Sequence, residues 1–332
     1  MQSLNAKFSA IHAAVRVSGF EPVRVRCVAR LDCEVWRIAA QDPAGDAREL
    51  CLRIYPERKN ERAPIESEVR WLRAAANDGL HVPRPVPDAT GRLVRTWWPD
   101  RAKPMRRAVL LTWLGGSMLD RALTRQRLHQ VGVLTARLHL VAAREVKAGR
   151  IATERLAHRA GFDEWIANAY PGSQVLGKRL RKLAAETALR LRDELAALPR
   201  DASSWGFIHG DLHPWNLLFT RDAAGAIDFS ECGLGHRSFE FASTLQWLRH
   251  PLVGNHDHGG SYVRLQHALL DGYASVAPLP ADVEREIDVF IVMRLLLAIE
   301  WILDDWPSLD HRPWGPGFLA ACEGLFARFL RT

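Results

Sequence analysis

A short segment between residues 207 and 229 constrains this chain of 332 residues more than any other. Two apolar runs, 207–208 and 217–219, flank a turn that carries the carboxylate of Asp211 and, five residues later, the carboxamide of Asn216. Another apolar run leads to a second carboxylate, Asp228, twelve residues after Asn216. Asp and Asn are common turn formers, but a simple polar turn explains neither this spacing nor the run that follows. The pattern therefore indicates a functional loop held between strands.

The composition is that of an ordinary folded protein. The chain is 48% hydrophobic and 25% charged, and it is long enough for two domains with a sizeable core. Its five cysteines are odd in number and lack CxxC spacing, which predicts neither a disulfide framework nor a zinc site. The most apolar segment, 289–303, contains Arg294 and Glu300 and is too short to span a bilayer. With no signal-peptide pattern at the start, the sequence predicts a cytoplasmic protein without a membrane segment.

The net charge of +7 raises the question of a nucleic-acid partner. The basic residues are spread along the chain instead of forming a tail, and no helix-turn-helix, zinc-finger or RNA-binding signature accompanies them. Nucleic acid is therefore not an expected partner. The charge remains compatible with an anionic nucleotide ligand.

Periodicity divides the chain into a part rich in strands and a part rich in helices. Alternating runs predict strands at 23–28, 35–39, 50–55 and 108–114, with one helix that begins near Pro64 and a loop at 79–91. After Gly115 and Gly116 the pattern becomes helical, at 123–141, 177–198, 238–248, 262–275, 281–306 and 317–330. The predicted boundary separates domain 1–114 from domain 115–332.

Several motifs, in order, resemble those of one superfamily. Residues 209–216, His-Gly-Asp-Leu-His-Pro-Trp-Asn, resemble the HGDxHxxN catalytic loop of the aminoglycoside phosphotransferase and choline-kinase-like superfamily, which are small-molecule relatives of the protein kinases. Residues 227–229, Ile-Asp-Phe, resemble its metal motif. Arg53 stands where the family has a strand lysine, and Glu68 fits the helix glutamate that pairs with it. The resemblance extends from about residue 20 to 306.

The resemblance implies a fold and an activity. The fold would be α+β, a bilobal protein-kinase-like fold with a small N-lobe of antiparallel sheet plus helix and a larger, mostly helical C-lobe. The N-lobe, 1–114, would bind the nucleotide, and the C-lobe, 115–332, would carry the catalytic loop and the acceptor site. The activity would be ATP-dependent transfer of the γ-phosphoryl group to a hydroxyl of a small molecule, as in aminoglycoside, amino-alcohol, homoserine or sugar kinases.

It also implies a role for each matching residue. Asp211 would orient the acceptor hydroxyl or act as the base that deprotonates it. Asn216 and Asp228 would hold Mg²⁺, a hard cation that prefers oxygen ligands. Arg53, paired with Glu68, would grip the phosphates of ATP.

Further positions would support the nucleotide and the loop. Residues 111–116 resemble the hinge, whose backbone at Thr112, Trp113 and Leu114 would receive the purine. The loop would be supported by three other side chains, His209, His213 and Glu240. We expect His209 and His213 to brace the loop through hydrogen bonds instead of taking part in the chemistry. A position near the substrate is the alternative for His213.

The chain departs from the family pattern at three places. Arg53 replaces lysine, and a guanidinium grips phosphate through a bidentate fork that an ammonium lacks. No GxGxxG loop is present, and residues 32–34 occupy the turn where it would lie. Glu240 stands where the family usually has aspartate, and its longer side chain can still accept hydrogen bonds from the catalytic loop.

The acceptor site leaves alternatives open. Glu300 and Asp304 lie four residues apart on one predicted helix face, where they could receive a cationic amine. A solvated face beside core tryptophans explains them equally well. The acceptor itself could also be a protein Ser or Thr, or the chain could be a nucleotide-binding pseudokinase with little turnover. A nucleic-acid-binding protein is the last alternative, and no motif indicates an oligomeric state.

Overall fold

The computed structural model describes residues 2–30, 33–57, 60–98, 102–119, 124–152, 177–221, 223–249, 259–304 and 315–331. The chain forms two compact units. Unit 1 comprises Met1–Ser117, Val141–Ala152 and Gly225–Ser230, and unit 2 comprises Met118–Leu140, Thr153–Ala224 and Glu231–Thr332. In the part of the chain so described, none of the helices combines the length and the hydropathy needed to cross a bilayer.

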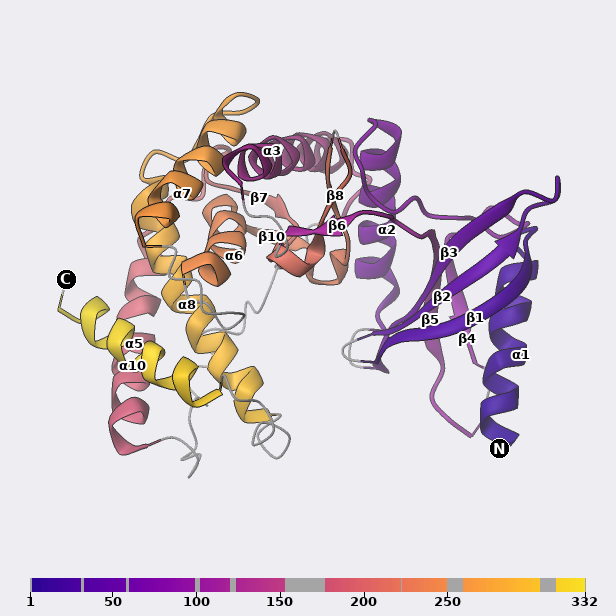
Figure 1. Ribbon diagram of the computed structural model, residues 1–332, viewed down its shortest axis with the longest axis horizontal. Helices are drawn as coiled ribbons and strands as arrows, with labels where there is room; N and C mark the ends of the chain where they lie inside the picture. The colour runs from indigo at the N-terminus through magenta and orange to yellow at the C-terminus, as the bar shows by residue number, and fades with distance from the viewer. Residues whose placement is uncertain are drawn as a thin grey trace. The chain divides into compact units, whose positions relative to one another are not determined.

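Unit 1 is built on an antiparallel sheet of five strands in the order β1-β2-β3-β5-β4 (Figure 1). The strands are β1 (Glu21–Arg30), β2 (Glu34–Gln41), β3 (Ala47–Ile54), β4 (Val94–Trp97) and β5 (Arg106–Thr112). A tight turn joins β2 to β3, because Asp42 accepts hydrogen bonds from the N–H groups of Ala44 and Asp46 and Gly45 adopts a φ of 87°. The sequence predicted this turn and four of the five strands, β1, β2, β3 and β5, but it did not predict β4.

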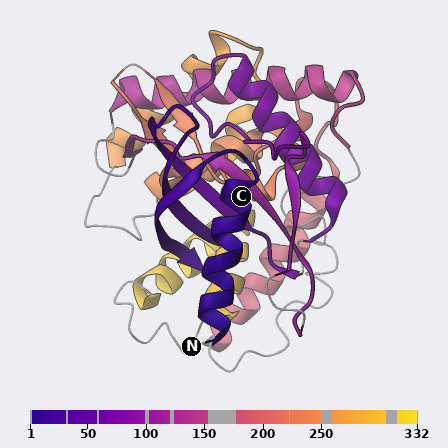
Figure 2. The ribbon, with the colours of Figure 1, turned by 90° about the vertical axis from the view of Figure 1, so that its right-hand side faces the viewer.

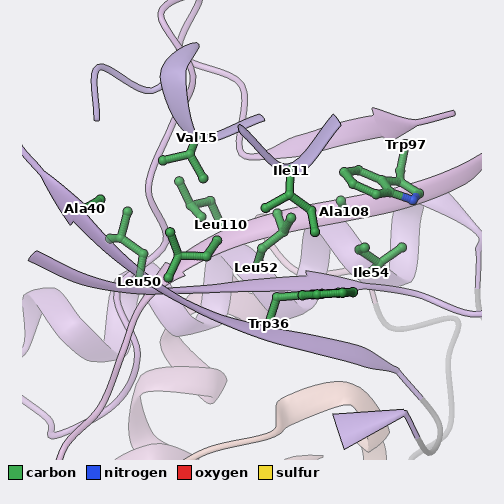
Figure 3. Close-up of a cluster of buried hydrophobic side chains, with 11 residues drawn as sticks. Ile11, Val15, Trp36, Ala40, Leu50, Leu52, Ile54, Trp97, Ala108 and Leu110 are labelled. Carbon is green, nitrogen blue, oxygen red and sulfur yellow. The ribbon is translucent and has the colours of Figure 1, made fainter. Parts of the chain in front are cut away.

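Helix α1 (Gln2–Arg16) covers one face of this sheet (Figure 2). The sequence predicted no helix there. Ile11 and Val15 of α1 are fully buried against alternate residues of the strands (Figure 3). Each such apolar side chain contributes roughly 1.5–3 kcal/mol when it is buried. The members of this core are Ile11, Val15, Trp36, Ile38, Ala40, Leu50, Leu52, Ile54, Trp97, Ala108 and Leu110.

Helix α2 (Arg62–Asn77) lies on the opposite face of the sheet (Figure 1). Because side chains alternate along a strand, β3 turns Leu52 and Ile54 toward α1 and Arg53 toward α2. Pro64 lies in the first turn of α2, where its missing N–H costs no helical hydrogen bond. The buried residues of α2 are apolar except for Ser67 and Glu68, and Glu68 is fully buried.

The segment 225–230 also belongs to unit 1. Gly225 forms a bridge with His81 and contacts it so closely that an added Cβ would overlap the carbonyl and the imidazole ring of His81. The ring of Phe229 packs edge-on against Trp71 of α2, with 5.1 Å between the centroids. These two contacts fix the position of Asp228, which lies between them in the sequence.

Unit 2 is mainly helical. Its helices are α3 (Arg125–Lys147, within this unit as far as Leu140), α5 (Lys178–Ala196), α6 (Arg237–Arg249), α7 (Gly259–Ala274), α8 (Val283–Asp304) and α10 (Gly315–Phe329). Helix α8 packs against α6, and α5, α8 and α10 pack together. A strand, β7 (Trp205–Ile208), pairs antiparallel with β10 (Gly233–His236) and leads into the loop that carries Asp211. The remaining short strands of the chain are β6 (Ser117–Met118), β8 (Leu217–Phe219) and β9 (Ala224–Ala226).

Two glycines allow α3 and α7 to cross in backbone contact. A Cβ at Gly132 of α3 would overlap the carbonyl of Leu269, and a Cβ at Gly272 of α7 would overlap the carbonyl of His129. The close crossing brings His139 of α3 within 3.0 Å of the hydroxyl of Tyr273 on α7. The crossing therefore brings the buried side chains of His139 and Tyr273 into hydrogen-bond contact between α3 and α7.

We predict that Gly132→Ala lowers the free energy of unfolding by about 1–3 kcal/mol, because the added methyl group must force the two helices apart. Gly324→Ala in α10 is the matched control, since a Cβ there meets nothing within 4 Å. That variant should gain up to about 1 kcal/mol from helix propensity alone. Urea unfolding measures both changes, and equal effects of the two substitutions would contradict the proposed close crossing.

Candidate active site

A buried ion pair in unit 1 connects the sheet to α2. Arg53 of β3 is 4% exposed, Glu68 of α2 is fully buried, and the two side chains form a salt bridge. The hydroxyl of Tyr55 accepts a hydrogen bond from Arg53 Nη2 at 2.8 Å and donates one to Glu68 Oε2 at 2.9 Å. Burying two charges is costly unless each is paired and hydrogen-bonded, and Tyr55 supplies bonds to both. The pair predicted from sequence is thus present with an added bridging hydroxyl.

Arg53 also reaches the second carboxylate of the motif. Its Nη1 lies 3.1 Å from Oδ1 of Asp228, whose side chain is 48% exposed. Asp228 has a φ of 58°, and it is the only non-glycine residue of the described chain with a positive φ. A left-handed conformation is costly for a residue with a Cβ and is typical of functional sites. Strand β9 therefore ends at Ala226, and the backbone turns to present this carboxylate.

The hinge segment 112–114 belongs to unit 1 as well. The N–H of Thr112 donates to the carbonyl of Arg84 at 2.9 Å, and the N–H of Trp113 donates to the carbonyl of Glu49 at 2.8 Å. Within the described residues, Leu114 has no hydrogen-bond partner for its N–H. Of the three N–H groups predicted to face a purine, two are thus used within the protein and that of Leu114 is available.

Unit 2 contains the loop that carries Asp211. Pro214 begins a short 3-10 turn, Pro214–Asn216, which returns the chain toward Asp211. Asn216 is 7% exposed, and its Nδ2 donates to the carbonyl of Asp211 at 2.9 Å. This bond orients the carboxamide and leaves its Oδ1 as an oxygen ligand. The five-residue spacing thus reflects one turn closed by its own side chain.

Glu240, from the first turn of α6, holds the backbone of the same loop. Its Oε2 accepts from the N–H of His209 at 3.0 Å, and its Oε1 accepts from the N–H of Gly210 at 2.8 Å. The ring of fully buried His209 accepts from the N–H of Asp211 at 3.3 Å. Glu240 and His209 thus hold the backbone of the loop through hydrogen bonds.

The surroundings of Glu240 make its carboxyl group unusually easy to protonate. Burial raises its pKa to about 7, although the two N–H donors and the charge of Arg294 act in the opposite direction. His139 Nε2 lies 3.9 Å away, but burial holds the pKa of His139 well below its usual value, so the imidazole is neutral. A neutral histidine cannot serve as a counter-ion for Glu240.

Arg294, near the middle of α8, contacts Asp211 directly, and sequence reasoning missed this contact. Its Nη2 lies 3.2 Å from Asp211 Oδ1, although the two residues are separated by 83 positions. One signal was available, because Arg294 interrupts an otherwise apolar run, and a buried charge needs a partner. Tyr55 was missed too, although it lies two residues from Arg53 on the same face of the chain.

His213 lies beside the other oxygen of Asp211 and packs against the first of two tryptophans. The Nε2 atom of His213 lies 3.4 Å from Asp211 Oδ2 and 3.3 Å from Asn216 Nδ2. The rings of His213 and Trp215 pack edge-on at 5.5 Å, and Trp215 packs in the same way against Trp247 of α6 at 5.0 Å. A row of aromatic rings therefore extends from His213 to Trp247 of α6.

Some of the predicted site residues belong to unit 1 and the others to unit 2. Unit 1 brings together Arg53, Glu68 and Asp228 and also contains the hinge, and unit 2 brings together His209, Asp211, His213, Asn216 and Glu240. Glu300 and Asp304 lie in the last two turns of α8, but their side chains are outside the described residues. Their predicted contact with an amine stays a prediction.

Each of the two predicted magnesium ligands offers an oxygen donor within its own unit. Asp228 offers a half-exposed carboxylate, and Asn216 offers a carboxamide oxygen whose orientation is fixed. Among the described residues, no group of three or more His, Cys, Asp or Glu side chains could hold a metal ion. Mg²⁺ usually takes one or two protein oxygens and completes its shell with phosphate oxygens and water, so the oxygens of Asp228 and Asn216 are of the kind that it binds.

Comparison with known sequences identifies a family. The model of the phosphotransferase enzyme family matches residues 37–279. An uncharacterized protein of Synechocystis sp. is 25% identical over 244 residues, which cover 73% of this chain and 63% of that protein. A homoserine kinase of Methylocella silvestris is 29% identical over 262 residues, which cover 77% of this chain and 73% of the kinase. The family predicted from the motifs is confirmed.

Comparison with solved structures confirms the predicted fold class. The amicoumacin kinase hAmiN, solved in complex with AMP-PNP, Ca²⁺ and Ami, has a TM-score of 0.78 at 19% identity, over 97% of this chain and 92% of that one. A microcompartment-associated aminopropanol kinase has a TM-score of 0.71 at 23% identity, over 97% of both chains. The choline kinase of Cryptosporidium parvum has a TM-score of 0.62 at 12% identity, over 100% and 96% of the two chains. At these identities the likeness shows the kinase-like fold.

We predict that the free energy of unfolding depends on pH through Glu240. The unfolded chain releases this proton near pH 4.3, whereas the folded protein keeps it to about pH 7. Between these values the native state binds more protons, so this group lowers stability as the pH rises. As the pH rises from 5 to 8, the free energy of unfolding of wild type should therefore fall by about 3 kcal/mol relative to that of Glu240→Gln. Urea unfolding at both pH values measures the change, and a constant difference between the two proteins would refute it.

Proposed function

The chain belongs to the phosphotransferase enzyme family, and we propose that it transfers the γ-phosphoryl group of ATP to a hydroxyl of a small molecule. The observation that carries this proposal is the loop of Asp211 and Asn216, which is closed on itself and anchored by Glu240. Phosphoryl transfer needs mainly positioning and charge stabilisation from a protein. A rigid loop that presents one carboxylate and one carboxamide supplies the positioning.

On the nucleotide side, unit 1 offers a fixed cation and a free backbone donor. The guanidinium of Arg53 is held by Glu68 and Tyr55, and its contact with the exposed Asp228 places it beside a partly solvated site. A guanidinium binds phosphate oxygens through a planar fork and keeps its charge. The N–H of Leu114 is the hinge donor available to a purine. We propose that the domain 1–114 binds ATP through these two groups.

On the acceptor side, Asp211 is the residue that orients the hydroxyl. A carboxylate within hydrogen-bond reach of an alcohol can align the oxygen for attack and take its proton as the bond to phosphorus forms. Asn216 and Asp228 would hold Mg²⁺, which when bound neutralises charge on the phosphate oxygens. We propose that the domain 115–332 contributes this loop and the acceptor site, and that the protein works in the cytoplasm.

The acceptor class that we propose is an amino alcohol. This proposal is supported by the sequence similarity to homoserine kinases, at 29% and 26% identity, and by the fold shared with an aminopropanol kinase. Homoserine and aminopropanol, the molecules in these names, each carry one alcohol hydroxyl and one amine. Glu300 and Asp304, at the end of α8, are the proposed partners of that amine.

The test is a coupled ADP-release assay with MgATP and a panel of homoserine, 1-amino-2-propanol, choline, ethanolamine and an aminoglycoside. We expect turnover with at least one amino alcohol. Asp211→Asn should lower kcat by about 10²–10⁴-fold and leave the Kd of MgATP within about threefold, because Asp211 belongs to the acceptor side of the reaction.

Two results would contradict the proposal. An Asp211→Asn variant with full activity would show that this carboxylate has no role in the transfer. Tight nucleotide binding without ADP release for any acceptor, or with label appearing only in protein, would favour the pseudokinase or the protein-kinase alternative. Mass spectrometry of the phosphorylated product distinguishes these cases.

A further inference from the structure

Arg294 is a buried cation in an apolar part of α8. It is 7% exposed, and its neighbours in the helix from Val289 to Leu297 are apolar side chains that are themselves buried. A charged group is almost never buried to this degree unless it is paired. The partners of Arg294 therefore reveal why the helix tolerates the charge.

Three hydrogen bonds and one ring fix the guanidinium. Nε donates to Gln246 Oε1 at 2.8 Å and Nη1 donates to Ser243 Oγ at 2.9 Å, and both acceptors belong to α6. The guanidinium carbon lies 5.2 Å from the centroid of the Phe239 ring, within the range of a cation–π contact. The third bond, from Nη2 to Asp211 Oδ1 at 3.2 Å, connects this fixed cation to the loop.

The two oxygens of Asp211 have different surroundings. Oδ1 contacts Arg294, which is immobilised by α6, whereas Oδ2 has longer contacts of 3.4 Å with His213 Nε2 and 3.5 Å with Asn216 Nδ2. Both contacts of Oδ2 are longer than the contact between Oδ1 and Arg294. A carboxylate rotates easily about its last torsion, so an anchor on one oxygen decides where the other oxygen points.

We propose that Arg294 is a positioning residue for the transfer. It holds Oδ1 of Asp211 so that Oδ2 faces the acceptor hydroxyl, and it does not itself touch the acceptor. The loop is thereby held at two points. Glu240 of α6 holds its backbone, and Arg294 of α8, which is bonded to Ser243 of α6, holds the carboxylate of Asp211. This inference rests on the proposed function, because it assigns a partner to the residue that orients the hydroxyl.

A positioning role differs from a stabilising role in which kinetic constant it changes. Misplacing a reactive group by about 1 Å can cost 10²-fold in rate, whereas lost packing lowers stability and leaves the rate of the folded enzyme unchanged. A residue that contacts the acceptor would instead alter its KM. The separation of kcat from KM therefore decides between these roles.

The experiment compares Arg294→Met and Arg294→Lys with a matched control, using the first amino alcohol of the panel that supports ADP release. Arg294→Met should lower kcat about 10–100-fold and leave both KM values within about twofold, because Oδ1 is no longer held. Arg294→Lys keeps the charge without the planar fork and should recover part of that loss.

The control is Arg95→Met in unit 1. Arg95 is also buried at 9% exposure, and its guanidinium donates to the carbonyls of Ala14 and Val86 and to Ser18 Oγ, far in sequence from the loop. This variant should lower the unfolding midpoint and keep kcat. An equal loss of kcat in both variants would overturn the inference, as would a loss confined to the KM of the acceptor.

If the proposed function is wrong, wild type itself releases no ADP with any acceptor. A second measurement, which needs no turnover, then still tests the inference. Unfolding midpoints of Asp211→Ala, Arg294→Met and the double variant form a cycle that reports whether the two side chains interact. We expect the double variant to lose less than the sum of the single losses. Additive losses would show that Arg294 does not hold Asp211 and would overturn the inference.

Discussion

The buried pairing of Arg53 with Glu68 is the interaction on which the proposed nucleotide-binding side of this protein depends. A guanidinium and a carboxylate at these depths are stable only together, because either one alone would be an uncompensated buried charge. Tyr55 adds a hydroxyl that bonds to both. The same guanidinium reaches Asp228, so a single side chain connects β3, α2 and the segment 225–230 of unit 1. The planar fork that distinguishes arginine from lysine makes these simultaneous contacts possible.

The loop 209–216 in unit 2, which we propose to be catalytic, is held in a different way. It has little regular structure, and it is held by acceptors and donors from two packed helices. Glu240 and Thr244 of α6 bond to the backbone at 209–212, and Arg294 of α8 bonds to the carboxylate of Asp211. Rigid helices can place a loop side chain accurately, because each support is fixed by its own packing. The raised pKa of Glu240 shows the cost of burying that support.

The sequence predicted the parts of the site that are local and missed those that depend on distant contacts. Asp211 and Asn216 lie in one turn, so their spacing alone revealed the loop, and the motifs predicted the fold class and the family. Helix α1 was missed because alanines and polar residues surround its few large apolar side chains. Arg294 lies 83 residues from its partner, and an isolated charge in an apolar run shows that a partner exists without showing which one. The roles of the two domains stay predictions.

The most direct test of the central claim is the affinity for nucleotide after both members of the buried pair are removed. The double variant Arg53→Met/Glu68→Gln leaves no unpaired buried charge, so it should fold. Isothermal titration should show about tenfold or greater weakening of MgATP binding, the value of one charged hydrogen bond. Adenosine lacks the phosphates that Arg53 would hold, so its affinity should not change. Unaltered MgATP binding by the folded double variant would contradict the account.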